Sequence, residues 1–441
     1  MSNFKKSVLS RSVKLFSTAS KIAGHELTQK LKESVSQSFE DYAPERLKVR
    51  VQQAKILAES LSQLKGAAMK VGQLLSLDSS DLLPPEVIEV LSQLQNKAEP
   101  TSFKEIEPVL KRDLSPEAIK ELHIEPIAFS AASIGQVHIA YRNSQKIALK
   151  VQYPGVRESV SSDLSIVRKA ASAFMAFSGK KMDLEPLFKE FENVLLQETD
   201  YVRERQLMSE YRQKVLGSSQ KDNYIIPTAY DDICSENILA MTFEDGIPLK
   251  QWIDSHPPQN QRKHIAHLIL DLYCQEFFDW GLVQTDPNYG NFLVRNDSQL
   301  VLLDFGSTQT YQPSFIQDYC SVLLAMNSGD PRAIIEQSIK FQLLDPREDA
   351  IAKEKYVEFM KLSLEPFSAH LQPFNFADKD YAERTLTVGR SFSNSLKYSA
   401  PPKHILLLHR KLGGIFNIIR RMDVALDLTP YWQRMLGTFR S

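Results

Sequence analysis

The chain has 441 residues, of which 43% are hydrophobic and 24% are charged, proportions that exclude a disordered or collagen-like chain. Its 53 lysines and arginines nearly balance its 54 aspartates and glutamates, which argues against a nucleic-acid partner. The three cysteines include no Cys-x-x-Cys pair, which argues against a cysteine-based metal centre. No apolar run approaches the ~18 residues of a spanning helix, so we expect a soluble or membrane-peripheral protein.

Residues 1–40 form a segment with a locally basic start. The first 25 residues carry five lysines and arginines and no acidic residue, with apolar residues between them. This pattern is compatible with a basic amphipathic helix on an anionic membrane surface, with a transit peptide, or with a solvated tail. The composition leaves these three interpretations open.

Residues 41–122 are expected to form a helical extension. Apolar residues recur at three- and four-residue steps from Leu57 to Leu75, as one buried face of a helix requires. Pro84 and Pro85 end that helix, and Pro85 can begin a second one that runs to about residue 94.

Residues 123–245 are expected to form a β-rich lobe with inserted helices. Two stretches, 129–140 and 147–151, flank turn-forming residues and predict an antiparallel hairpin. Further helices and strands are predicted after the hairpin: helices at 160–177 and 185–211, and strands at 224–227 and 238–243.

Residues 246–441 are expected to form a mostly helical lobe, interrupted by a strand pair at 292–295 and 300–303. The most specific pattern of the chain brackets this pair. Asp286 and Asn291 lie five residues apart, and Asp304 opens an Asp-Phe-Gly sequence 13 residues after Asn291. An Asp-x4-Asn loop followed by Asp-Phe-Gly is the arrangement of a kinase catalytic loop and its metal-binding aspartate.

The residue types in this pattern suit phosphoryl transfer. Amide and carboxylate oxygens are ligands that Mg²⁺ prefers, so Asn291 and Asp304 are the predicted metal ligands. Asp286 is placed to orient or deprotonate a nucleophile. Each residue alone has an ordinary explanation, such as a turn, and only their joint order and spacing indicate a kinase-like site.

The upstream half of the chain offers a phosphate-binding lysine. Lys150 follows Ile-Ala-Leu in a predicted strand, where a kinase presents its lysine to the α- and β-phosphates. A carboxylate must hold such a lysine in place. The next predicted helix offers three candidates, which are Glu198, Asp200 and Glu204.

An alanine-rich loop precedes this lysine. Ala131, Ala132, Ser133 and Gly135 stand where an ordinary kinase has a glycine-rich loop over the phosphates. Small side chains still permit close approach, but their Cβ atoms restrict the backbone. We therefore expect the nucleotide geometry or preference to differ from that of an ordinary kinase.

With these motifs, the chain resembles the UbiB family of atypical kinase-like proteins, which are tied to ubiquinone biosynthesis. Lys70-Val71-Gly72-Gln73 matches the KxGQ signature of the family, and Glu198-Thr199-Asp200 matches its ExD signature. The sequences at 409–413 and 431–432 also resemble the C-terminal region of the family. The resemblance implies an α+β, protein-kinase-like, two-lobed fold with a helical N-terminal extension that carries the KxGQ motif.

The resemblance also implies a role for each matched residue. Lys150 would bind phosphate with Glu204 as its partner, and Asp286 would be the catalytic aspartate. Asn291 and Asp304 would hold Mg²⁺, and the nucleotide would lie against the loop of Ala131, Ala132, Ser133 and Gly135. The regulatory residues would be those of the two signatures, with Lys70 pointing towards Glu198 and Asp200: Lys70, Gly72, Gln73, Glu198 and Asp200.

The implied function is Mg²⁺-dependent ATP hydrolysis or atypical kinase activity that supports the synthesis of ubiquinone or another isoprenoid quinone. The nucleotide would be ATP or ADP, and the implied partners are an anionic or quinone-precursor lipid and enzymes of quinone biosynthesis. A true protein or small-molecule kinase and a non-catalytic pseudokinase scaffold are the alternatives. The expected location is the cytoplasmic face of an inner membrane, with a mitochondrial location as the alternative.

Overall fold

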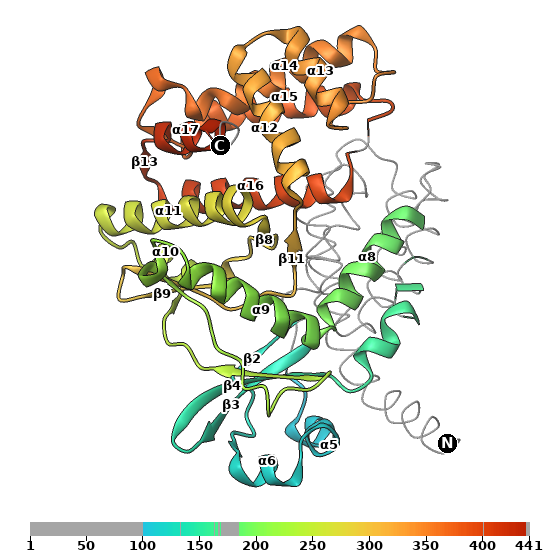
Figure 1. Cartoon of the computed structure of the whole chain (residues 1–441), viewed down its shortest axis with the longest axis vertical. Helices are drawn as coiled ribbons and strands as arrows, with labels where there is room; N and C mark the ends of the chain where they lie inside the picture. The colour runs from blue at the N-terminus through green and yellow to red at the C-terminus, as the bar shows by residue number, and fades with distance from the viewer. Residues whose placement is uncertain are drawn as a thin grey trace, which may run out of the picture. The chain divides into compact units, whose positions relative to one another are not determined.

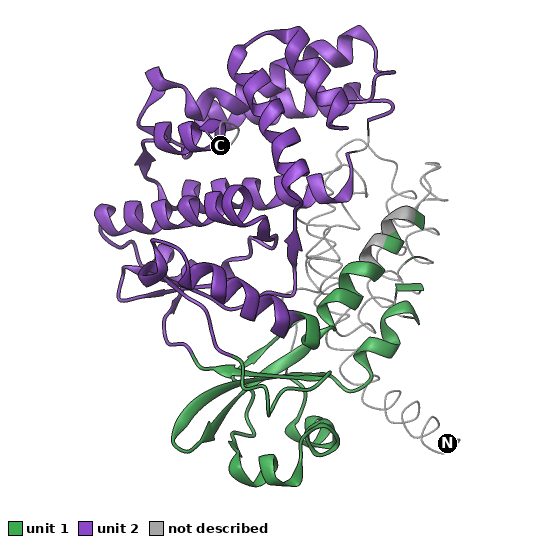
Figure 2. Cartoon of the chain, in the orientation of Figure 1, with its two compact units in different colours: residues 1–203, 229–243 green, residues 204–228, 244–441 purple. Residues whose placement is uncertain are grey.

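The computed structural model describes residues 100–437, except residues 133, 163, 166–167, 169–184 and 400. The chain divides into two compact units (Figures 1 and 2): unit 1 comprises residues 1–203 and 229–243, and unit 2 comprises residues 204–228 and 244–441. The KxGQ motif and the helices predicted between residues 57 and 94 lie outside the described residues, as does most of the helix predicted at 160–177. The domain boundaries drawn from the sequence stay a prediction.

An antiparallel sheet forms the centre of unit 1. Its strands follow the order β1-β3-β4-β6, and β2 also pairs with β3. The predicted hairpin is confirmed as β3 and β4, whose two-residue loop has φ of 49° at Asn143 and 66° at Ser144, as a primed hairpin turn requires. The strands are β1 (His123–Ile124), β2 (Ser130–Ala131), β3 (Gly135–Arg142), β4 (Gln145–Gln152) and β6 (Ile238–Thr242).

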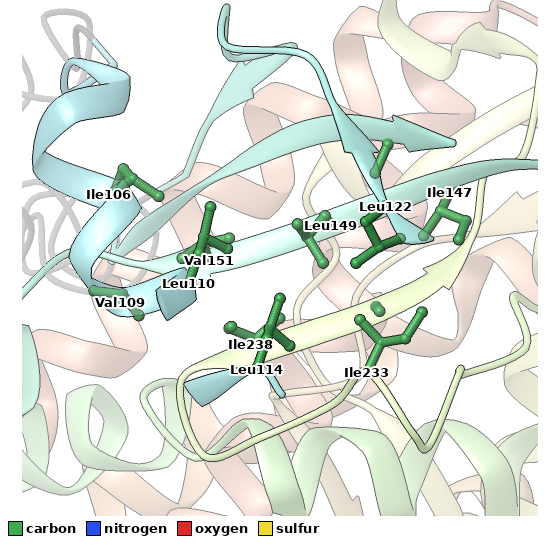
Figure 3. Packing of buried hydrophobic residues seen from close by; sticks show 12 residues of the cluster. Ile106, Val109, Leu110, Leu114, Leu122, Ile147, Leu149, Val151, Ile233 and Ile238 are labelled. Atoms are coloured by element: carbon green, nitrogen blue, oxygen red, sulfur yellow. The ribbon is translucent and has the colours of Figure 1, made fainter. Parts of the chain in front are cut away.

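One face of this sheet carries the core of unit 1 (Figure 3). Ile147, Leu149 and Val151 alternate along β4 with no exposed surface, and they pack against helices α5 (Phe103–Asp113) and α6 (Pro116–Glu121) with the segments around them. Burying each such side chain stabilises the fold by about 1.5–3 kcal/mol. Because side chains alternate along a strand, Lys150 projects from the other face of β4.

The helix predicted at 185–211 is divided in two, α8 (Glu185–Glu198) and α9 (Tyr201–Leu216). Two contacts explain the break. Asp200 Oδ1 accepts a hydrogen bond of 2.9 Å from the Arg203 amide, so Asp200 caps α9. Gln152 Nε2 donates to the Thr199 carbonyl at 2.6 Å and fixes the peptide between the helices to the end of β4. The helical periodicity continues across this point and does not reveal the interruption.

The described residues of unit 2 form three small sheets. The strand pair predicted around residue 297 is confirmed as β9 (Phe292–Arg295) and β10 (Gln299–Leu302), within a sheet of order β5-β10-β9-β7. The other strands of that sheet are β5 (Tyr224–Ile225) and β7 (Ile247–Pro248). The remaining pairs, which the sequence did not predict, are β8 (Leu282–Gln284) with β11 (Thr308–Thr310) and β12 (Phe374–Asn375) with β13 (Ala425–Leu426).

Helices make up most of the rest of unit 2, as predicted. They are α10 (Leu249–Asp254), α11 (Gln259–Cys274), α12 (Pro313–Ser328), α13 (Pro331–Lys340), α14 (Ala350–Leu364), α15 (Lys379–Ser395), α16 (Lys403–Met422) and α17 (Thr429–Gly437). A π-helical turn, Gln275–Trp280, extends α11 and ends at Gly281, which has φ of 61°. A Cβ at Gly281 would lie 2.6 Å from the Tyr311 carbonyl oxygen, so glycine is needed where the chain turns into β8. In the described part of the chain, no helix combines the length and apolar character needed to cross a bilayer.

A buried histidine sits on β3, beside the strand that carries Lys150. His138 Nδ1 lies 2.8 Å from the Glu125 carbonyl oxygen, and Nε2 lies 2.8 Å from Gln136 Nε2. Because a carbonyl only accepts, we assign the proton to Nδ1 and the acceptor role to Nε2. This arrangement requires the neutral ring, and burial lowers the pKa of His138 by more than its bond to Glu125 raises it.

We expect His138 to make unit 1 sensitive to mild acid. Since its folded-state pKa is depressed, its stabilising contribution is complete above the ordinary histidine pKa of about 6.5 and is lost as the pH falls. The wild-type free energy of unfolding should fall by about 1 kcal/mol more than that of His138→Asn between about pH 7.5 and pH 5.5. The variant keeps a donor for Glu125 and cannot be protonated. Equal pH dependence of thermal unfolding in the two proteins would contradict the assignment.

Candidate functional site

Hydrogen bonds between two of its own residues stabilise the predicted catalytic loop. It follows β8 and enters β9 through a 3-10 turn, Tyr289–Asn291. Asn291 Nδ2 donates to both the backbone oxygen and Oδ2 of Asp286, each at 3.1 Å. The structure therefore brings Asp286 and Asn291 together. Because the side-chain amide nitrogen of Asn291 already donates within the loop, its amide oxygen is the atom suited to bind a metal ion.

The Asp-Phe-Gly segment lies directly beside this loop. The Leu303 amide donates to the Asn291 carbonyl at 3.1 Å, so Asp304 follows a residue that is bonded to the other predicted metal ligand. Asp304 Oδ1 accepts a hydrogen bond of 2.9 Å from the Gly306 amide. This places the two predicted Mg²⁺ ligands on neighbouring, hydrogen-bonded strands of chain.

Two carboxylates approach Gly306. A Cβ built there would lie 3.4 Å from Asp304 Oδ1 and 3.7 Å from Glu204 Oε2. Glu204 is buried, near the start of α9. Both carboxylates thus face the same glycine, and carboxylate oxygens of this kind are ligands that suit a divalent ion. Within the described ranges, no group of three histidine, cysteine, aspartate or glutamate side chains forms a metal cluster. Mg²⁺ commonly takes its remaining ligands from phosphate and water.

Arg410 of α16 contacts the second carboxylate oxygen of Asp286, the predicted catalytic aspartate. Its Nη2 lies 3.1 Å from Asp286 Oδ1, and both side chains are only 8% exposed. The two oxygens of the Asp286 carboxylate therefore each have a named donor, Arg410 and Asn291. Arg410 was not predicted as part of the site, because it is 124 residues away from Asp286 and no local spacing links the two.

A second cation of α16 lies beneath the loop. Lys411 is 1% exposed, and its Nζ lies 3.2 Å from Glu276 Oε2 and 3.2 Å from Gln284 Oε1. Glu276 Oε1 also accepts from the Tyr211 hydroxyl at 2.8 Å and from the backbone amide of Gln284 at 3.1 Å. Burial raises the pKa of Glu276, against the lowering effect of Lys411 and of these hydrogen bonds. Gln284 stands two residues before Asp286, so this buried network supports the start of the catalytic loop.

Helix α9 joins the same network through an aromatic contact. The Tyr211 ring lies 5.1 Å from the ring of Phe305, the central residue of Asp-Phe-Gly, and 5.5 Å from that of Trp280. Tyr211 thus contacts the Asp-Phe-Gly segment and, through Glu276, the network beneath the predicted catalytic loop. The helix that carries Glu204 is therefore tied to both segments of unit 2.

Unit 1 holds the predicted phosphate-binding residues. Lys150 Nζ lies 4.9 Å from the centre of the Tyr201 ring, a cation–π distance. A Cβ at Gly135 would lie 2.3 Å from the Val151 carbonyl oxygen and 3.0 Å from the Tyr201 hydroxyl, so no side chain fits there. Gly135, Lys150 and the start of α9 therefore share one small region.

The alanine-rich loop is a tight turn. Ala131 pairs with Gln136 between β2 and β3, and the Ala132 amide donates to the Gly135 carbonyl at 2.8 Å. Ser133 lies outside the described residues. Of the ExD residues, Glu198 ends α8 and Asp200 caps α9.

The site residues fall in both units. Ala131, Ala132, Gly135, Lys150, Glu198 and Asp200 belong to unit 1, whereas Glu204, Asp286, Asn291 and Asp304 belong to unit 2. Lys150 and Glu204 thus belong to different units, and their pairing stays a prediction. Lys70, Gly72 and Gln73 lie outside the described residues.

We expect the positive charge of buried Lys411 to balance the negative charge of buried Glu276. Lys411→Met leaves the Glu276 carboxylate buried without its cation and should lower the free energy of unfolding by about 3–5 kcal/mol in chemical denaturation. Adding Glu276→Gln should recover part of this loss, because it removes the uncompensated charge. The exposed Lys379→Met on α15 is the control and should change stability by less than about 0.5 kcal/mol. A double variant no more stable than Lys411→Met would rule out the proposed balance.

Comparisons with known proteins show which family this chain is similar to. The ABC1 atypical kinase-like domain matches residues 93–338. The mitochondrial atypical kinase coq-8 of Caenorhabditis elegans is 29% identical over 380 residues, which cover 84% of this chain and 49% of the relative. The mitochondrial atypical kinase COQ8 of Saccharomyces cerevisiae is 29% identical over 388 residues, 86% of this chain and 75% of the relative. The chain thus spans about half the length of the nematode relative.

A solved structure has a similar fold. Rv3197 of Mycobacterium tuberculosis, solved in complex with erythromycin, matches with a TM-score of 0.62 and 21% identity, over 86% of this chain and 95% of that chain. At this identity the match concerns the fold alone. The predicted mixed helix-and-sheet, kinase-like fold is confirmed. Because the ABC1 match spans more than half of the sequence, this chain belongs to the ABC1, or UbiB, family of atypical kinase-like proteins.

Proposed function

We propose that this protein binds ATP with Mg²⁺ and hydrolyses it, or transfers its γ-phosphoryl group, in support of ubiquinone or another isoprenoid quinone. The observation that carries the proposal is the hydrogen-bonded pair of Asp286 and Asn291 in unit 2, with Asp304 next to Leu303, whose amide bonds the Asn291 carbonyl. Family membership and the similarity to relatives named atypical kinases support the same reaction class.

Two residues would hold the metal ion. The Asn291 amide oxygen and the Asp304 carboxylate offer hard oxygen ligands on adjacent segments. A bound Mg²⁺ would neutralise charge on the β- and γ-phosphates. Asp304 also bonds the Gly306 amide, so the side chain is oriented by its own turn.

Asp286 would orient the attacking group and accept its proton. A carboxylate can do this from a fixed position, and Asp286 is held by Asn291 on one oxygen and by Arg410 on the other. Lys150 would bind the phosphates, with Glu204 as its carboxylate partner, and the small residues of the 131–135 loop would let the backbone approach the nucleotide.

The KxGQ motif would regulate this site. We propose that Lys70, Gly72 and Gln73 cover the place where a peptide substrate would dock, with Glu198 and Asp200 as the anionic partners of Lys70. Asp200 already caps α9, so this carboxylate also has a structural task. If peptides are excluded, water or a small lipid-like acceptor is the natural nucleophile.

We propose action at the surface of a quinone-bearing membrane, on the cytoplasmic side of an inner membrane or in mitochondria, where the names of the nematode and yeast relatives place those proteins.

A true protein or small-molecule kinase is the second candidate, and the names of the relatives favour it. The products of the reaction separate the two. Release of free phosphate from labelled ATP without a labelled acceptor indicates hydrolysis, and a labelled protein or metabolite indicates a kinase. Nucleotide binding with neither product would indicate a non-catalytic scaffold.

Asp304→Asn should abolish Mg²⁺-dependent turnover. The change removes the ligand charge but keeps an oxygen that can accept from Gly306, so the fold should survive while turnover drops by about 100-fold or more. Phosphate release and acceptor labelling measure turnover, and circular dichroism measures folding. Asp318→Asn, an exposed change on α12, is the control. Wild-type turnover in Asp304→Asn would refute the metal assignment.

A further inference from the structure

We propose that Arg410 is a positioning residue for Asp286, and that the part of α16 around it supports the predicted catalytic loop. This inference rests on the proposed function. Arg410 and Asp286 form an ion pair of 3.1 Å in which each side chain is 8% exposed. A largely buried pair of this kind is shielded from solvent and salt, unlike a surface ion pair.

Three neighbouring parts of α16 engage the same short stretch of chain. Arg410 bonds Asp286, and Lys411 bonds Gln284 two residues earlier. One turn further along the helix, a Cβ at Gly414 would lie 2.2 Å from Cγ of Pro287, the residue after Asp286. The helix backbone thus packs directly on the loop, and its two cations fix the loop at two points.

The residue immediately before Asp286 in this loop is not a cation. In an ordinary protein kinase an arginine immediately precedes the catalytic aspartate, whereas this chain has Thr285 there. The Thr285 hydroxyl donates to the Ser307 carbonyl at 2.7 Å, which ties it to the segment after Asp-Phe-Gly. Asp286 forms an ion pair with Arg410, which comes from a distant helix.

The arrangement restricts how the carboxylate can turn. Asn291 Nδ2 binds Oδ2 and Arg410 Nη2 binds Oδ1, so rotation of the Asp286 carboxylate would break both contacts. Loss of Arg410 should misplace the group that orients the nucleophile. The effect should fall on kcat, because Arg410 acts through Asp286.

Steady-state Mg-ATP turnover of the full chain tests this role in wild type, Arg410→Met and Arg410→Lys. We expect kcat to fall about 100-fold in Arg410→Met and to recover in part in Arg410→Lys, with KM and nucleotide affinity nearly unchanged. Arg420→Met, an exposed change on the same helix, should match wild type. Unchanged kcat in Arg410→Met, or an equal change in KM and affinity, would overturn the positioning role.

Adjacent glycines provide a matched pair of variants. A Cβ at Gly413 meets no described atom within 4 Å, whereas one at Gly414 collides with Pro287. Gly413→Ala should therefore keep wild-type kcat, and Gly414→Ala should lower it by displacing the loop. Equal kcat in both variants would argue against α16 as the support of the loop.

Hydrogen exchange of the 284–291 segment does not depend on turnover and separates the two claims. Faster exchange in Arg410→Met than in Arg420→Met supports positioning. If exchange in the 284–291 segment is slower in wild type than in Arg410→Met but wild type does not turn over ATP, the proposed ATP chemistry fails and the positioning role stands. If exchange is the same in both variants, the positioning role fails whether or not wild type turns over ATP. Arg410→Lys serves in the same comparison if Arg410→Met does not fold.

Discussion

A nearly buried carboxylate must be matched by donors, and Asp286 is the point at which this requirement shapes the structure. Removing a charged group from water is costly unless hydrogen bonds and an opposite charge compensate. Asn291 provides the bond from within the loop, and Arg410 provides both a bond and a charge from α16. The loop conformation, the close packing of Gly414 on Pro287 and the path of the chain into β9 are all consistent with keeping these donors in place.

A second buried carboxylate near the loop also needs a cation. Glu276 is buried at a π-helical turn, a feature that often accompanies functional sites, and it is balanced by Lys411. Tyr211 bonds Glu276 and packs against Phe305. Any shift of α9 would therefore disturb the Asp-Phe-Gly segment and the support of the catalytic loop together. Glu204 lies on that helix, so the position of this carboxylate and the integrity of the Asp-Phe-Gly segment are physically linked within unit 2.

Local spacing explains which parts of the site could be predicted. Asp286, Asn291 and Asp304 lie within one loop and one short hairpin, so their separation in sequence nearly determines their geometry. Arg410 depends on how a helix more than a hundred residues away packs, and no periodicity encodes that contact. The division between α8 and α9 likewise depends on the hydrogen bond from Gln152 to Thr199, while β8 and β11 have three residues each, too few for an alternating pattern to be recognised.

The central claim is that this group of side chains holds a metal–nucleotide complex. Calorimetric titration of the full chain with ATP, once in Mg²⁺ and once in EDTA, tests it most directly. Because Asn291 and Asp304 would hold a Mg²⁺ ion that offsets phosphate charge, Mg²⁺ should tighten ATP binding by about tenfold or more. Equal affinity for ATP in Mg²⁺ and in EDTA would contradict the account.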